Sequence, residues 1–148
     1  MIRKYEEQDL EEIINIFIAA SRLAHSFVSE EFIQEEVHNI RSLYIHQTRT
    51  FVYEHNHKVI GFICLMANEI GALFVAPQWH GCGIGKDLMN YVRSLHKTLE
   101  VEVFKENQMA RSFYETCGFT ELKEHIHTSG HTLLRLRYDM MSLSLKKS

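Results

Sequence analysis

The stretch of sequence that decides the fold of this chain is Ala76-Pro77-Gln78-Trp79-His80-Gly81-Cys82-Gly83-Ile84-Gly85-Lys86-Asp87-Leu88-Met89. An apolar segment that reads as a strand, residues 70–75, precedes it, and apolar side chains spaced three and four apart follow it, as on one face of a helix. Its three alternating glycines allow positive φ and leave no Cβ in the way of a ligand. The first amides of the helix have no partner within it and can bind an anion. The stretch therefore predicts a strand, a glycine turn and a helix that together bind a phosphate group.

The spacing of the glycines excludes two common phosphate loops. A dinucleotide fingerprint, G-x-G-x-x-G, fails because neither Gly81 nor Gly83 is followed by the third glycine in register. A nucleotide triphosphatase loop, G-x-x-x-x-G-K-[ST], fails because His80 and Asp87 occupy positions that need glycine and a hydroxyl residue. Two interpretations of the turn remain: it binds a different phosphate ligand, or it is only a tight connection between strand and helix.

A second motif lies one strand downstream, and its key residues are Asn107, Ala110, Phe113, Tyr114, Gly118 and Phe119. Asn107 can cap a helix on which Tyr114 follows two turns later along the same stripe. The small Ala110 between them leaves room for a thin ligand arm. Gly118 ends this helix as a C′ glycine. The plainer interpretation is an amphipathic helix with Phe113 and Tyr114 in the core.

Together the two motifs resemble those of the GCN5-related N-acetyltransferases (GNAT family), in particular small bacterial members. The family's loop pattern, [Q/R]-x-x-G-x-[G/A], is matched by Gly83 and Gly85, with His80 where Gln or Arg is usual. The pattern N-x-x-A-x-x-F-Y-x-x-x-G-F is matched at every named position of the second motif. The resemblance implies an α/β fold with four helices and a mixed central sheet of six to seven strands. In that sheet the glycine-loop strand and the Leu99 strand splay apart.

The resemblance also implies acetyl-CoA as the cofactor and assigns residues to it. Main-chain groups of Leu73, Phe74 and Val75 would hold the pantetheine and the thioester, as an added strand is held. The turn would bind the pyrophosphate, and the second motif would line the arm. The remaining residues so implied are Gly81, Cys82, Gly83, Ile84, Gly85, Lys86, Asn107, Ala110 and Phe113.

The implied reaction is direct acetyl transfer to a primary amine of a small molecule or a peptide. Tyr114 corresponds to the general acid, because a phenol stays protonated at neutral pH and can donate to the departing thiolate. Two residues are alternatives for the base: Glu69, acting directly or through water, and His25. The expected acceptor pocket is lined by His25, Phe27, Phe32 and Trp79, with Glu30, Glu31 or Glu69 attracting a cation. The alternative interpretation places the aromatic residues in the hydrophobic core and the acids at a solvated helix start.

Periodicity predicts the remaining elements. A strand at residues 2–5 precedes a helix capped by Asp9 with Glu12, and Ser29 begins a second helix. Strands at 50–55 and 59–67 form a hairpin, and the chain ends with strands at 119–126 and 132–138. The order is β-α-α-β-β-β-α-β-α-β-β.

Composition limits the other function classes. The 148 residues, 45% of them apolar, predict one domain over residues 1–148. A net charge of -3 without a basic block argues against nucleic acid, and no apolar run suits a signal or a membrane span, so a cytoplasmic protein is expected. Three cysteines without a C-x-x-C pair suggest reduced thiols, and ten histidines form no standard metal set. Two alternatives stay open: a coenzyme A sensor without turnover, and a nucleotide- or metal-binding domain.

Overall fold

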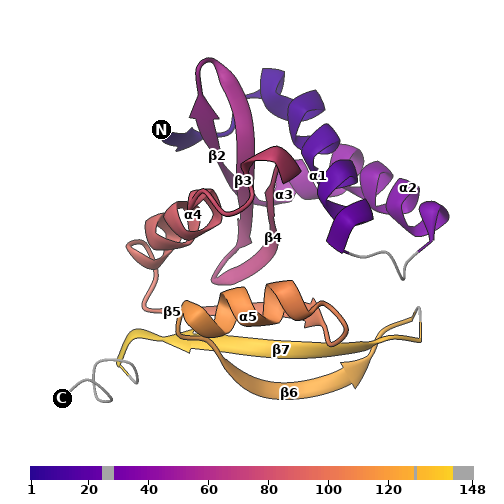
Figure 1. The fold of residues 1–148 in the computed structure, drawn as a ribbon, viewed down its shortest axis with the longest axis vertical. Helices are drawn as coiled ribbons and strands as arrows, with labels where there is room; N and C mark the ends of the chain where they lie inside the picture. The colour runs from indigo at the N-terminus through magenta and orange to yellow at the C-terminus, as the bar shows by residue number, and fades with distance from the viewer. Residues whose placement is uncertain (25–28, 129, 142–148) are drawn as a thin grey trace.

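The computed structural model describes residues 1–24, 29–128 and 130–141, which form one mixed seven-stranded sheet with helices on both faces (Figure 1). The sheet order is β1-β2-β3-β4-β5-β7-β6. The strands are β1 (Ile2–Lys4), β2 (Arg49–His55), β3 (Lys58–Met66), β4 (Glu69–Val75), β5 (Thr98–Phe104), β6 (Thr120–Ile126) and β7 (Thr132–Asp139). The predicted order of strands and main helices is confirmed.

Four helices longer than one turn occur in the described ranges, as the sequence predicts. They are α1 (Leu10–Ala24), α2 (Glu30–Asn39), α4 (Ile84–Arg93) and α5 (Gln108–Thr116). Shorter pieces adjoin them: 3-10 turns η1 (Glu7–Asp9) and η3 (Pro77–Trp79), the π-helical η2 (Ile40–Tyr44) and α3 (Ile45–Gln47). None of the helices in the described ranges has the length and apolar character needed to cross a membrane.

Apolar side chains form one core on each face of the sheet. β3 explains the division, because its residues are buried on both sides: Ile63 faces the core under α4 and α5, whereas Phe62 faces the core under α1 and α2. Gly61 lets α4 approach β3 closely, since a Cβ there would lie 3.1 Å from the Ile84 side chain.

The sheet splits between β4 and β5. These parallel strands pair only at Glu69 with Glu100 and at Ile70 with Val101. Beyond those pairs β4 continues to Val75 while β5 turns away, and Figure 1 shows β2–β4 and β5–β7–β6 running in different directions. The predicted splay of the glycine-loop strand from the Leu99 strand is confirmed, and it opens the middle of the sheet to a ligand.

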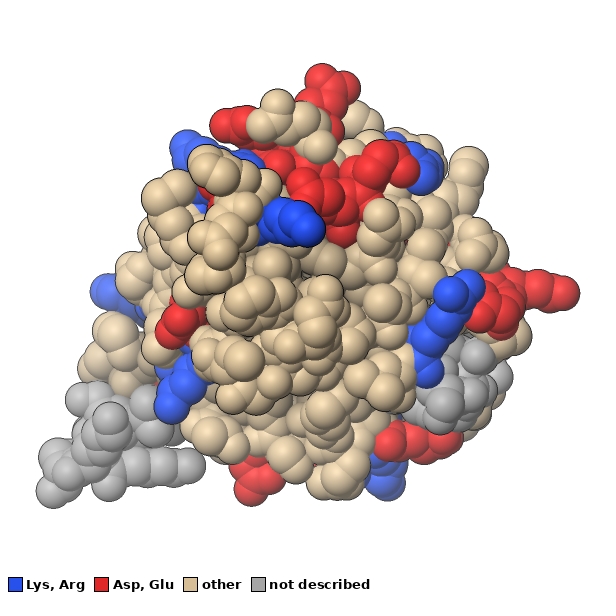
Figure 2. Space-filling model, turned by 45° about the horizontal axis from the view of Figure 1, so that its top comes forward, with Lys and Arg blue, Asp and Glu red and all other residues tan. Residues whose placement is uncertain are grey.

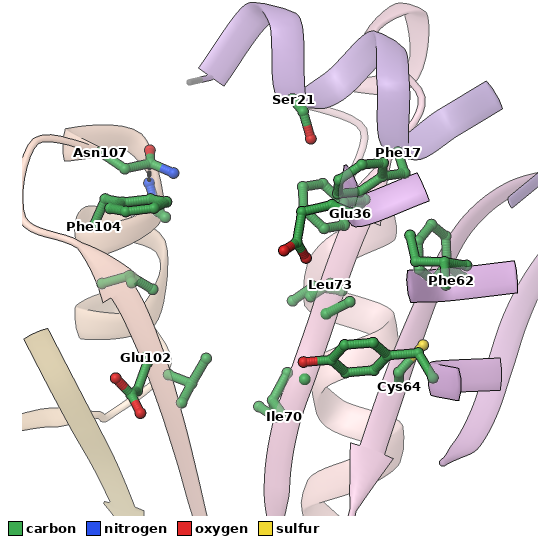
Figure 3. A pocket seen from close by; sticks show the side chains of 18 of the residues that line it. Phe17, Ser21, Glu36, Phe62, Cys64, Ile70, Leu73, Glu102, Phe104 and Asn107 are labelled. Carbon is green, nitrogen blue, oxygen red and sulfur yellow. Dashed lines mark hydrogen bonds between the residues drawn. The ribbon is translucent and has the colours of Figure 1, made fainter. Parts of the chain in front are cut away.

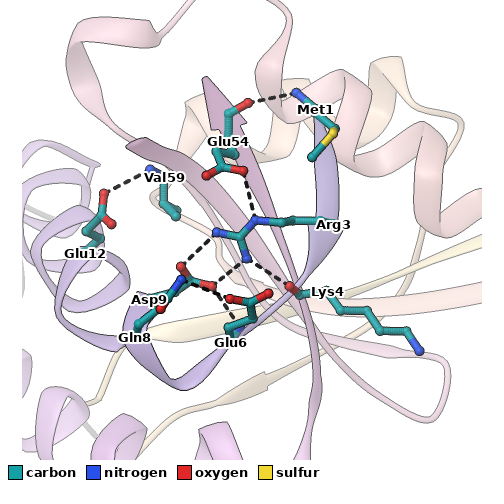
Figure 4. Close-up of polar contacts among 9 residues, drawn as sticks. All are labelled: Met1, Arg3, Lys4, Glu6, Gln8, Asp9, Glu12, Glu54 and Val59. Atoms are coloured by element: carbon teal, nitrogen blue, oxygen red, sulfur yellow. Dashed lines mark hydrogen bonds and ion pairs between the residues drawn. The ribbon is translucent and has the colours of Figure 1, made fainter. Parts of the chain in front are cut away.

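The start of the first helix differs from the prediction. The capping box joins Glu6 and Asp9, not Asp9 and Glu12, and Glu12 instead accepts a hydrogen bond from the Val59 amide at 2.9 Å. The Asp9 carboxylate is engaged by both outer nitrogens of Arg3, at 2.9 and 3.0 Å (Figure 4). The cap begins three residues earlier because the buried Asp9 takes its partners from β1 and from the Glu6 amide.

Replacing Asp9 with alanine is expected to lower the free energy of unfolding by about 3 kcal/mol, since Arg3 loses its buried partner. Burial alone would raise the pKa of Asp9, but hydrogen bonds from Arg3 and Glu6 lower it below its usual value. A lowered pKa contributes stability that is complete above about pH 4 and is lost as the pH falls further. Urea unfolding should therefore show a smaller difference in the free energy of unfolding between variant and wild type at pH 3 than at pH 7. A gap no larger than that of the exposed control Glu7→Ala at pH 7 would contradict this account.

Candidate active site

The glycine turn has the geometry that its sequence predicts. Gly81 and Gly83 adopt φ of 79° and 84°, values that a side chain disfavours, and no described atom lies within 4 Å of where their Cβ atoms would be. Gly83 is the N-cap of α4, and because it has no side chain it cannot accept a hydrogen bond from the first amides of the helix. The first amides of α4 are therefore available to an anion beside the turn.

The second motif forms α5, across the splay from the turn. Asn107 caps it, and its side-chain oxygen accepts a hydrogen bond from the Ala110 amide at 3.1 Å. Gly118 has a φ of 94° just after the helix. The turn, β4 and α5 together enclose a groove of about 400 Å³. Eleven of the twelve predicted cofactor residues line it, namely Leu73, Phe74, Val75, Gly81, Gly83, Ile84, Gly85, Lys86, Asn107, Ala110 and Phe113.

Three residues in and next to the glycine turn have surroundings that the sequence did not predict. Cys82 lies in the turn but is exposed and does not line the groove. Trp79, predicted for the acceptor pocket, lines this groove instead and packs against His55, with ring centroids 4.9 Å apart. His80 places Nε2 2.8 Å from the Val75 carbonyl oxygen, so this nitrogen donates to the end of β4. The imidazole thus fastens the turn to the strand.

The groove fits the pantetheine and pyrophosphate of coenzyme A. Gly85 keeps it open, because a Cβ there would lie 3.5 Å from Phe113 and 3.7 Å from Val75. Among the described residues that line it, Lys86 is the one lysine or arginine. Figure 2 likewise shows the charged residues mainly around the margin of the face seen there. Phosphate binding in this groove would rest on main-chain amides and a helix N-terminus.

A second cavity, of about 210 Å³, lies on the α1 and α2 side of the splay. Figure 3 looks into it between β4 and β5, with Leu73 and Glu36 on one side and Phe104 and Asn107 on the other. Most of its wall is apolar. The predicted aromatic residue Phe32 lines it, whereas His25 and Phe27 fall outside the described residues.

Tyr114 stands where the two cavities meet. Five residues line both cavities: Leu73, Phe74, Asn107, Ala110 and Tyr114. The Tyr114 side chain is 5% exposed, and no described residue forms a hydrogen bond with its hydroxyl. Burial, with a smaller contribution from Cys117, raises the pKa of Tyr114 above its usual value. The phenol therefore stays protonated and can serve as a proton donor.

Glu69, the first predicted base, is held by an arginine. Arg135 Nη2 lies 2.5 Å from a Glu69 oxygen, and the same guanidinium contacts Glu100 at 2.6 Å and Glu102 at 3.0 Å. Glu69 lines neither of the two cavities. Glu102, the first residue of β5 beyond the paired segment, does line the second cavity, and His125 Nε2 lies 2.9 Å from its other oxygen.

Among the polar residues of this cavity that were missed from the sequence, two lie on the covering helices α1 and α2. Glu36 on α2 directs its carboxylate into the cavity, and Ser21 on α1 has a buried hydroxyl with no hydrogen-bond partner among the described residues (Figure 3). Both stand in ordinary amphipathic helices, where a cavity-facing Glu or Ser has no distinctive spacing. Their role becomes visible only when the two helices are placed over the splay.

Comparison with known proteins points to one family of enzymes. Residues 46–121 match the family model for the acetyltransferase (GNAT) domain. Two similar relatives are Escherichia coli peptidyl-lysine N-acetyltransferases: YiaC, 32% identical over 120 residues (80% of this chain and 82% of YiaC), and YjaB, 28% identical over 118 residues (80% of each). The solution structure of the apo form of E. coli YjaB superposes with a TM-score of 0.83 at 27% identity, covering 93% of this chain and 96% of that one.

These likenesses favour acetyl transfer to an amine and give no support to a sensor without turnover. The family match spans half of the chain and includes the glycine turn and α5. With the splay, the turn and the capped α5 in the expected places, the chain belongs to the GNAT family of acetyltransferases.

Proposed function

We propose that this acetyltransferase uses acetyl-CoA to acetylate the side-chain amine of lysine in peptides or proteins. The observation that carries the proposal is the junction of the two cavities at Tyr114. A donor lying in the groove and an amine lying in the cavity would meet there. Such positioning converts an encounter of two molecules into a reaction between fixed groups.

The cofactor site is built mainly from backbone. Amides of the turn from Gly81 to Lys86 would bind the pyrophosphate, and β4 from Leu73 to Val75 would bind the arm as if it were the missing strand. Coenzyme A supplies the acetyl group in activated form, as a thioester. A β4 amide near Phe74 or Val75, left without a β5 partner by the splay, would stabilise negative charge on the reacting oxygen. Tyr114 would donate the proton that the departing sulfur needs.

The acceptor cavity suits a lysine side chain. Lysine carries a compact ammonium group on a flexible four-carbon stem. The cavity offers apolar walls for the stem, and Glu36 and Glu102 supply negative charge for the ammonium. The names of YiaC and YjaB as peptidyl-lysine N-acetyltransferases point to the same class of acceptor.

A short peptide with one internal lysine and a blocked N-terminus should be acetylated with a kcat/KM at least tenfold above that for n-butylamine, which keeps the chain and the amine but lacks the peptide. The reason is added binding by the peptide on either side of the lysine. Release of the coenzyme A thiol and mass spectrometry of the peptide measure this. The same peptide with arginine in place of lysine should not react. Equal rates for peptide and alkylamine would contradict a peptide acceptor.

A further inference from the structure

We infer that Glu36 is the carboxylate that receives the ammonium group of the acceptor and removes a proton from it. This inference rests on the proposed function, because it concerns the amine that occupies the cavity. The amine must lose a proton before its nitrogen can attack a thioester. A carboxylate that does this must face the cavity, lie near the junction and be free of a competing cation.

Glu36 is freer of competing cations than the other carboxylates of the site. Among the described residues, Glu36 and Glu102 are the two carboxylates that line the cavity. Glu102 is engaged by Arg135 at 3.0 Å and by His125 at 2.9 Å, and Glu69 is engaged by Arg135 outside the cavity lining. No described residue forms a hydrogen bond or an ion pair with Glu36. Its carboxylate is therefore available to an incoming ammonium group.

The packing of α1 and α2 places Glu36 opposite the junction. One ion pair joins Arg22 to Glu30 at 2.7 Å, and another joins Glu11 to Arg41 at 2.5 Å. The two helices are therefore antiparallel. Glu36 lies about midway between Glu30 and Arg41 along the chain. It is therefore level with the middle of the segment between Arg22 and Glu11, which is the second turn of α1.

Phe17, which lies in that turn of α1, packs against a residue of the junction between the two cavities. Its ring packs edge-on against Phe74, with centroids 5.2 Å apart, and Phe74 lines both cavities. Figure 3 shows the Glu36 carboxylate in the cavity, on the same side of it as Phe17 and Leu73, and Leu73 is another residue of the junction. An amine bound to Glu36 would thus stand beside the strand expected to carry the thioester.

Two further properties fit a site for a polar ligand. Burial, and secondarily the charge of Glu35, raise the pKa of Glu36 above its usual value, although His127 opposes the shift. A carboxylate with a raised pKa accepts a proton more readily. Independently, the Ser21 hydroxyl is 2% exposed, unpartnered among the described residues and directed into the same cavity. A buried hydroxyl without a partner is costly, and a hydrogen-bonding ligand would satisfy it.

The proton and bond changes balance as follows. The ammonium gives one proton to the Glu36 carboxylate, and the nitrogen lone pair forms the bond to the acetyl carbon. The C–S bond breaks with its electron pair on sulfur, and sulfur takes a proton from Tyr114. The nitrogen releases its second proton as the amide forms, and this proton restores Tyr114 through solvent. The Glu36 proton leaves to solvent, so the net products are the acetylated amine, the free thiol and one proton.

The test is the pH profile of kcat/KM for the lysine peptide in Glu36→Gln, with Glu35→Gln as matched control. Glu35 is an exposed neighbour on the same helix that lines neither cavity. The titratable groups lining the cavity with Glu36 are Tyr44, Cys64, Glu102 and Tyr114, and His127 and Glu35 influence it from outside the lining. All of these remain in Glu36→Gln, so a change of profile reports on Glu36 itself.

We expect Glu36→Gln to lose about 100-fold at pH 7.5. The wild-type profile should be flat between the Glu36 pKa and the amine pKa near about 10. That of Glu36→Gln should rise about tenfold per pH unit, since only amine already neutral in solution can react. Glu35→Gln should stay within about twofold of wild type. Equal behaviour of the two variants, or a flat profile in Glu36→Gln, would overturn the inference.

Two measurements distinguish a wrong role for Glu36 from a misfolded variant and from a wrong acceptor. Thermal stabilisation by coenzyme A should be the same in Glu36→Gln and wild type, which shows that the variant is folded and binds the cofactor. If the wild-type enzyme does not acetylate the peptide at all, the proposed acceptor is wrong. If it does and Glu36→Gln matches Glu35→Gln, the role of Glu36 alone is wrong.

Discussion

Replacing Tyr114 with phenylalanine is expected to lower kcat for acetyl transfer by about 100-fold, because the departing sulfur loses its proton donor. The affinity for acetyl-CoA should change by less than about twofold, since the ring that lines the groove is kept. Stability should also be nearly unchanged, because no described residue hydrogen-bonds the hydroxyl and none is left unpaired by its removal. Steady-state thiol release and calorimetric titration with coenzyme A measure the two parts.

Tyr138→Phe is the matched control for this prediction. Tyr138 is also a buried tyrosine of the same core, 6% exposed, but it lines neither cavity. Its variant should keep kcat within about twofold of wild type. If Tyr114→Phe turns over as fast as Tyr138→Phe, Tyr114 is not the proton donor.

Replacing Gly85 with valine should weaken acetyl-CoA binding at least tenfold. The backbone of Gly85 lies outside the positive-φ region, so valine is tolerated there, and its Cβ would contact Phe113 and Val75 at ordinary distances. The two added methyl groups would enter the groove, and overfilling a packed site costs about 1–3 kcal/mol. Each 1.4 kcal/mol is a factor of about ten in affinity.

Asp87→Val provides the comparison, since Asp87 is exposed in the same first turn of α4 and does not line the groove. Its dissociation constant for coenzyme A, measured by calorimetry, should stay within about threefold of wild type, allowing for the lost charge at the helix N-terminus. An unchanged dissociation constant in Gly85→Val would mean that the cofactor does not pass between α4 and α5.

The parts of the site that are local in sequence were predictable. The turn depends on glycines two residues apart, and α5 depends on a cap, a small residue and a glycine stop at fixed spacing. Backbone geometry over ten or so residues follows from such patterns. Gly83 and Asn107 accordingly occupy the positions and conformations that their motifs imply.

The acid–base partners were not predictable, because strand register and helix placement decide them. Arg135 lies opposite Glu102 in the β5–β7 pairing, while Glu69 lies opposite Glu100 in the β4–β5 pairing. One guanidinium can therefore engage all three carboxylates, and no sequence spacing reveals this. The cap of the first helix shows the same effect, since Asp9 takes its partner Arg3 from the neighbouring strand.

The two faces of one split sheet would then hold the two reactants. On the α4 and α5 face, the glycine turn and the start of α4 line a groove that would hold coenzyme A. On the α1 and α2 face, apolar side chains and two carboxylates line a cavity that would receive the amine. Tyr114 lines both, so its buried hydroxyl, which has no hydrogen-bond partner among the described residues, would lie between the two reactants.

The structure of the complex with coenzyme A tests this account most directly. We expect diphosphate oxygens within hydrogen-bond distance, about 3 Å, of amides between Gly81 and Lys86, and the sulfur within about 4 Å of the Tyr114 hydroxyl. A diphosphate bound away from the turn, or a sulfur out of reach of that hydroxyl, would contradict it.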